Sequence, residues 1–79
     1  MTVDHKKALD LAREGKWDEA HQMIQSFSDQ MSCLIHGYLH RVEGDLKNAR
    51  YWYNRANMTM PENTLEEEIN RIYELINTI

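Results

Sequence analysis

The sequence predicts an all-α domain built from antiparallel helical hairpins. Only one proline and three glycines interrupt 79 residues that are otherwise rich in helix-forming side chains. Apolar residues recur at the three- and four-residue spacings of a helix face, and we find no β-branched alternation typical of strands. The stretches Gly15–Ala20 and Gly44–Ala49 also place a glycine, a bulky apolar residue and an alanine at matching positions, 29 residues apart.

The bulk composition limits the classes of function. A chain of 79 residues with 42% hydrophobic and 28% charged residues fits one folded domain, spanning 1–79, with a thin core. Its net charge of −4 argues against binding nucleic acid or an anionic membrane. The single cysteine, Cys33, cannot form an internal disulfide, and MTVDHKKALD lacks the apolar core of a signal peptide. We therefore expect a cytoplasmic protein without a membrane span.

The first hairpin is predicted at about 3–28. Its first helix starts near Thr2 or Asp4 and ends at Gly15, because glycine accepts the left-handed conformation that follows many helices. The inner positions expected for this helix are Val3, Ala8, Leu11 and Ala12. The second helix begins near Trp17 and shows one apolar face, made of Trp17, Ala20, Ile24 and Phe27.

The second hairpin is predicted at about 29–59. Its first helix, about 29–43, has N-cap candidates at Ser26, Ser28 and Asp29 and should be the most buried helix of the chain. The apolar positions expected there are Met31, Leu34, Ile35, Tyr38, Leu39 and Val42. The polar line expected there is Asp29, Ser32, His36, His40 and Glu43. The next helix, about 46–58, should bury Leu46, Ala49, Tyr53 and Ala56, place Trp52 at the edge and expose Tyr51.

A last helix is predicted at about 62–79, after Pro61. Thr64 and Glu67 have the spacing of a capping box, and an acidic first turn suits the helix dipole. One apolar stripe follows, made of Leu65, Ile69, Ile72, Ile76 and Ile79. We expect this amphipathic helix to cap the exposed end of the repeat and Glu66, Glu67 and Glu68 to face solvent.

The second hairpin resembles a tetratricopeptide-type repeat. The positions that carry the resemblance are Gly37, Gly44, Leu46, Ala49, Tyr53, Ala56 and Pro61. The string ARYWYNRA is similar to the Sel1-like branch of that superfamily, and HRVEGDLKNARYWYNRA looks like that of small bacterial proteins with this repeat. The first hairpin matches in part, with a 29-residue offset shorter than the family's repeat. The resemblance implies a right-handed stack of hairpins that binds proteins or peptides and carries no single activity.

We therefore expect a non-catalytic protein–protein interaction module with no cofactor. Two repeats are fewer than the three that usually make a stable stack, which favours self-association, for example as a homodimer through the first or last helix. No nucleophile motif supports an enzyme. The alternative is a small domain that binds an anion or metabolite through a patch of histidine, arginine and tyrosine.

The candidate binding residues are basic and aromatic side chains of the second hairpin. They are His36, Tyr38, His40, Arg41, Arg50, Tyr51 and Arg55. Arginine forks suit the carboxylates of a peptide or metabolite. The alternative for the arginines is pairing within the chain, of Arg41 with Asp45 or of Arg50 with an acid on the last helix.

Cys33, His36 and His40 offer metal-ligand atoms at helical spacing. A structural zinc site needs four ligands, and no second Cys/His pair lies nearby in the sequence. We therefore expect no metal here, and interpret Cys33 as a buried thiol and the histidines as hydrogen-bonded at a helix junction.

Overall fold

A computed structural model describes residues 3–78 of the chain. Within this range the chain forms helices only: α1 (His5–Arg13), α2 (Trp17–Ile24), α3 (Gln30–Val42), α4 (Leu46–Arg55) and α5 (Leu65–Asn77). The all-α prediction is confirmed for the described residues. None of these helices combines the length and the apolar character needed to cross a bilayer. The proposed start at Thr2 and the stripe position Ile79 lie outside the described residues.

Three of the helices end in the same way. After α1 the backbone of Gly15 takes φ +81°, and after α3 that of Gly44 takes φ +84°. In both places the amides of the glycine and of the residue after it donate to carbonyls near the end of the helix, as in Lys16 N to Leu11 O at 2.9 Å and Asp45 N to His40 O at 2.9 Å. Asn57 repeats the conformation after α4, with φ 58°. The first two of these reversals create the hairpins α1–α2 and α3–α4.

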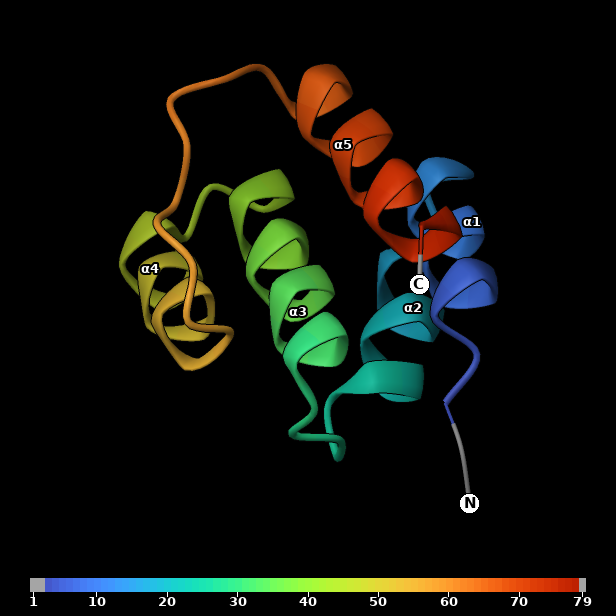
Figure 1. Cartoon of the computed structure of the whole chain (residues 1–79). Helices are drawn as coiled ribbons and strands as arrows, with labels where there is room; N and C mark the ends of the chain where they lie inside the picture. Colours follow the sequence, from blue (N-terminus) through green and yellow to red (C-terminus); the bar gives the residue numbers. More distant parts are fainter. Residues whose placement is uncertain (1–2, 79) are drawn as a thin grey trace.

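Helix α3 lies at the centre of the molecule, with α4 on one side and α1 and α2 on the other (Figure 1). Its N-cap Asp29 accepts a hydrogen bond from Ser32 N at 3.1 Å, which confirms one of the predicted caps. Every residue from Ser32 to His40 is buried, so the prediction that this helix is the most buried is confirmed. Of the predicted polar line, Ser32, His36 and His40 are buried, in keeping with the expectation that the histidines lie at a helix junction, while Asp29 and Glu43 are exposed. The predicted apolar position Val42 is 43% exposed.

The core otherwise follows the predicted faces, with three corrections. Leu9 is fully buried in α1 beside Ala8, whereas Leu11 and Ala12 are only half-buried. Leu46 is 48% exposed, because it begins α4 outside the contact with α3. Phe27 lies beyond the end of α2. Ala20, Ile24, Ala49, Tyr53 and Ala56 are buried as predicted.

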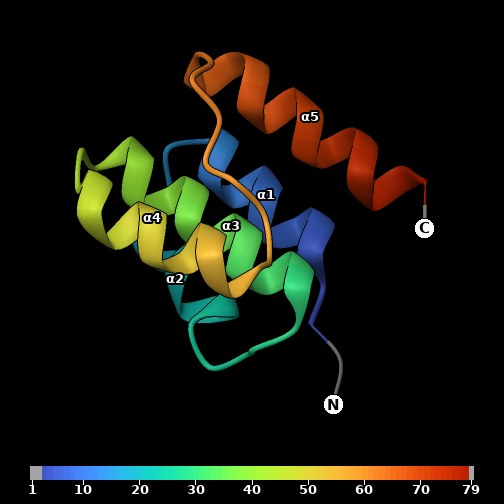
Figure 2. The same cartoon turned by 60° about the vertical axis from the view of Figure 1, so that its left-hand side comes forward.

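Helix α5 starts as predicted but lies elsewhere than expected. Thr64 and Glu67 form the capping box, and Ile69 and Ile72 are buried while Leu65 is 37% exposed. Figures 1 and 2 show α5 beside α1 and α3, joined to α4 by a long connection. Among the described residues the α5 backbone packs on α1 and α3 and not along α4. The helix therefore covers the first helices of both hairpins, and not the outer end of the second.

Candidate functional site

Three histidines from two helices meet between α2 and α3. His36 and His40 lie one turn apart on the same face of α3, and His21 reaches them from α2. The Nε2 atoms of His21 and His36 are 3.0 Å apart, and one ring nitrogen of each histidine lies within 4.8 Å of the other two. His36 is 4% and His40 7% exposed, while His21 is half-buried. The three imidazoles thus form one cluster, which we call the histidine cluster.

Two tryptophans enclose the histidine cluster. The Trp17 indole stacks on His21 with ring centroids 4.7 Å apart, and the Trp52 indole stacks on His36 at 3.8 Å. Trp17 Nε1 also donates a hydrogen bond of 2.7 Å to the Leu39 carbonyl, which joins α2 to α3. These contacts fix the imidazole planes and keep much of the cluster away from water.

The electrostatics of the cluster favour neutral imidazoles. Burial, with His21, His40 and Arg55 nearby, lowers the pKa of His36 to about 4. Burial and His40 also lower the pKa of His21 below 6.5. Nδ1 of His40 lies 2.6 Å from Oε1 of Glu43, an acceptor to which an Nδ1–H group donates. The Nδ1 atom of His36 is buried and has no hydrogen-bond partner among residues 3–78.

The predicted binding residues do not form one patch. His36, Tyr51 and Arg55 contact Trp52, and His40 stacks on His36. The Arg55 guanidinium lies 4.9 Å from the Trp52 ring and 5.9 Å from that of Tyr51. Tyr51 is 53% exposed, as predicted. Arg50 is exposed and, within the described part of the chain, forms no ion pair with α5.

Tyr38 and Arg41 lie on another side of α3, toward α5. Tyr38 is 6% exposed. Arg41 donates hydrogen bonds of 2.8 Å and 2.6 Å to the side chain and the carbonyl of Asn63, and no bond to Asp45. Its guanidinium is therefore engaged within the molecule, although with a partner other than the predicted one.

Cys33 is not part of the histidine cluster. Its thiol is fully buried and donates to the Ser28 carbonyl at 3.6 Å, near the start of α3. The set Cys33, His36 and His40 therefore does not assemble, whereas His21 takes the place of the cysteine beside the two histidines. The three imidazoles are the nitrogen donors that could hold a metal ion here.

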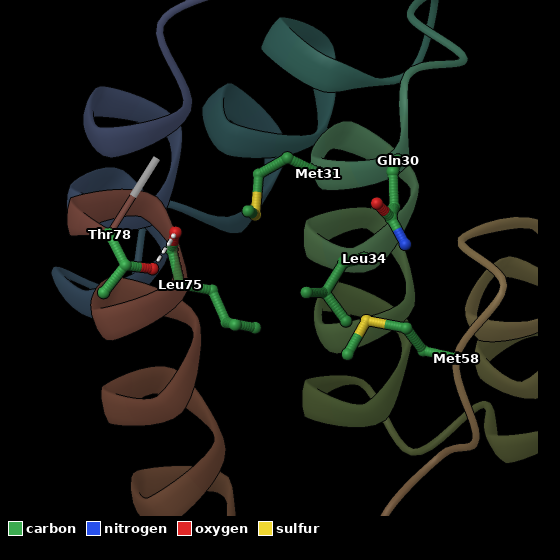
Figure 3. Close-up of a pocket in the computed structure, with 6 residues that line it drawn as sticks. All are labelled: Gln30, Met31, Leu34, Met58, Leu75 and Thr78. Carbon is green, nitrogen blue, oxygen red and sulfur yellow. Dashed lines mark hydrogen bonds between the residues drawn. The ribbon is translucent and has the colours of Figure 1, made fainter.

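A second feature is an apolar groove between α3 and α5. Figure 3 shows Leu75 of α5 pointing toward Met31 and Leu34 of α3, with Met58 closing one side. The cavity measures about 270 Å³, and Gln30 and Thr78 line its ends. Gln30 donates a hydrogen bond of 2.8 Å to the Ala56 carbonyl, which fixes that end of the groove. In the part of the chain that the structure describes, no charged side chain lines it.

His21 was not predicted as a site residue, because helical spacing relates only residues of the same helix. The sequence did contain a signal. Trp17 and His21 are four residues apart on one predicted helix, and His36 and His40 are four residues apart on the next, so the two residues of each pair lie on the same face of their helix. The groove was missed because it depends on where α5 lies.

Comparisons with protein-family models, curated proteins and solved structures found no match to this chain.

Proposed function

We propose that this protein is a non-catalytic, tetratricopeptide-like interaction module that binds a basic amphipathic segment of a partner protein. The observation that carries the proposal is the apolar groove between α3 and α5. The repeat-like pairing of α1 with α2 and of α3 with α4 agrees with the resemblance of the second hairpin to that family.

The lining of the groove favours side chains of a protein over a metabolite. Its volume of about 270 Å³ is close to the lower end of the range of roughly 300–1,000 Å³ typical of small-molecule sites, so the lining and not the volume distinguishes the two kinds of ligand. Methionines such as Met31 and Met58 adapt to differently shaped apolar partners. One or two leucine-like anchors of a helix would fill this space, in the manner of helix-in-groove recognition. An anionic metabolite would find no cation among the lining residues.

The net charge of the chain favours a basic partner. The groove is lined by Gln30 at the positive N-terminal end of α3 and by Thr78 at the negative C-terminal end of α5, so the two helix dipoles offset each other. Glu74 is exposed on α5, and the whole chain carries a net charge of −4. Lysines or arginines that flank the apolar anchors would therefore be attracted to the acidic surface around the groove.

A designed peptide tests the proposal. The probe is a fluorescein-labelled helical peptide with leucines at heptad positions and lysines elsewhere, compared with a peptide carrying glutamates in place of the lysines. Fluorescence anisotropy should show binding of the lysine peptide and at least about tenfold weaker binding of the glutamate peptide, equivalent to about 1.4 kcal/mol. Leu75→Lys should weaken binding by a similar factor.

Leu46→Lys is the matched control, because Leu46 is an exposed leucine outside the groove. It makes the same change of charge and should leave the affinity within about twofold, well under the tenfold that corresponds to 1.4 kcal/mol. Met31→Gln provides a second groove variant of unchanged charge. Equal affinities of the Leu75 and Leu46 variants, or a preference for the glutamate peptide, would contradict the proposal. Light scattering on the free protein, compared with the Leu75→Lys variant, shows whether a second copy binds through the groove instead.

A further inference from the structure

The histidine cluster is an unusual arrangement for a merely structural role. A pair of neutral imidazoles forms one hydrogen bond, in which one Nε2 donates and the other accepts. The cluster brings a third imidazole beside that pair, with one ring nitrogen of each histidine within 4.8 Å of the other two. Nδ1 of His36, the other nitrogen of that ring, is buried and has no hydrogen-bond partner among the described residues, and an ion bound at Nε2 would leave it unpaired.

The ring nitrogens lie close to the spacing of a metal site. Zinc binds histidine nitrogens at about 2.0–2.1 Å, which separates two nitrogens of a tetrahedral site by about 3.3 Å. Nε2 of His21 and Nε2 of His36 are 3.0 Å apart, a distance that also fits a hydrogen bond, and a nitrogen of each histidine lies within 4.8 Å of the others. An ion would draw the three nitrogens together from these positions.

The surroundings supply what metal-binding histidines usually have. Ligating histidines commonly donate their other ring N–H to a carboxylate, which fixes the tautomer and raises the basicity of the ligand. Glu43 accepts in this way at Nδ1 of His40, 2.6 Å away, so that Nε2 of His40 keeps a free lone pair. Trp17 and Trp52 hold the planes of the other two imidazoles by stacking.

We propose that His21, His36 and His40 bind one divalent transition-metal ion, with zinc as the reference metal, and that Glu43 positions His40. Three histidines leave a fourth position for water, and the half-buried side chain of His21 gives the ion access from solvent. Imidazole ligands suit zinc, copper and nickel, so the site is assigned to this class and not to magnesium or calcium, which prefer oxygen. The site is independent of the α3–α5 groove.

Calorimetric titration of tag-free, chelator-treated protein with zinc chloride tests the proposal. We expect one ion per chain, with micromolar or tighter affinity. Glu43→Gln should weaken binding by about 10–100-fold, the usual effect of removing such a carboxylate. His21→Gln and His40→Gln should weaken it more. His5→Gln is the matched control, because His5 is the remaining histidine of the chain and lies outside the cluster. Its Nε2 atom lies 2.8 Å from Oδ2 of Asp29.

A measurement on the unchanged protein guards against variants that fail to fold. Imidazole nitrogen resonances recorded during zinc titration should shift for His21, His36 and His40, while those of His5 stay in place. Cobalt(II) should give the intense visible absorption of a tetrahedral nitrogen site. The proposal is overturned if no ion binds at 100-fold excess of zinc, if His5→Gln loses as much affinity as His21→Gln, or if the shifts are confined to His5.

Discussion

The hydroxyl of Tyr53 donates a hydrogen bond of 2.6 Å to Oε2 of Glu68, and both side chains are fully buried. Arg71 binds the same carboxylate through two hydrogen bonds of 2.7 Å and 2.8 Å, and Asn63 adds a third donor at 3.0 Å. A buried carboxylate is tolerated only when such partners replace the water that it loses. This network joins α4 to α5, whose backbones do not pack together.

Replacing Tyr53 with phenylalanine should destabilise the fold while preserving the shape of the core. Hydrogen bonds to charged groups contribute about 1.5–3 kcal/mol, so we expect the free energy of unfolding to fall by about that amount. Urea denaturation measures it. Tyr51→Phe is the control, since Tyr51 is 53% exposed, and should change stability by less than about 0.5 kcal/mol. Equal effects of the two substitutions would show that the hydrogen bond to Glu68 contributes nothing.

The same network predicts a pH dependence of stability. Burial raises the pKa of Glu68, but hydrogen bonds from Arg71, Tyr53 and Asn63 outweigh it and hold the pKa below 4.5. In the pH range between the folded and unfolded pKa values, the unfolded state therefore binds more protons. The stabilisation is fully present above about pH 4.5 and is lost as the pH falls through the lower, folded pKa.

Glu68→Gln isolates this contribution, because other carboxylates titrate equally in both proteins. Urea denaturation at several values between pH 7 and pH 3 should show the stability difference between wild type and variant shrinking as the pH falls below 4.5, the reference value for Glu68. Two curves that run parallel over this range would contradict the prediction.

The sequence predicted those features that are decided within one helix or one turn. The reversals at Gly15 and Gly44, the N-cap at Asp29 and the capping box at Thr64 each depend on residues only a few positions apart. Helical spacing also identified the buried faces of α2 and of most of α4.

Features decided by a partner on another helix were not predicted. Glu68 was expected in solvent with its acidic neighbours, and it is buried because Tyr53, Asn63 and Arg71 converge on it. His36 and His40 were expected at a helix junction, but their partner there, His21 on the preceding helix, was not identified. A polar residue reveals burial only together with its partner, and periodicity along one helix does not identify that partner.

Gly37→Ala should destabilise the fold, although alanine is the better helix former. A Cβ at this position would lie 2.7 Å and 2.9 Å from two ring carbons of Tyr53 and 3.2 Å from the Ala49 carbonyl oxygen. The Tyr53 ring has little freedom to move, since Glu68 holds its hydroxyl. Overpacking of this kind costs about 1–3 kcal/mol, which exceeds the gain of about 0.5–1 kcal/mol from removing a helical glycine.

Thermal and urea denaturation would measure the effect of Gly37→Ala. Asn54→Ala on exposed α4 surface is the control and should be neutral or slightly stabilising, because only helix propensity changes there. Adding Tyr53→Leu to Gly37→Ala should cost less than the sum of the two single changes, since it removes the atoms in conflict. A stabilised Gly37→Ala protein would mean that α3 and α4 do not cross this closely.

Cys33 should react very slowly with thiol reagents in the folded protein. The side chain is fully buried, burial raises the pKa of its thiol, and Sγ donates to the Ser28 carbonyl. Because the thiolate is the reactive form, modification requires local or global opening of the N-terminal end of α3. At pH 8 the rate of modification by Ellman's reagent should be at least about 100-fold lower than in urea, and denaturant should raise this rate in proportion to the open population.

The control is Ser26→Cys combined with Cys33→Ala. It places a thiol at an exposed position just before α3, and this thiol should react in the folded state nearly as fast as in the unfolded chain. Rapid modification of Cys33 under native conditions would show that the start of α3 opens freely, and that the contacts of Asp29 with Ser32 and of Gln30 with Ala56 do not secure it.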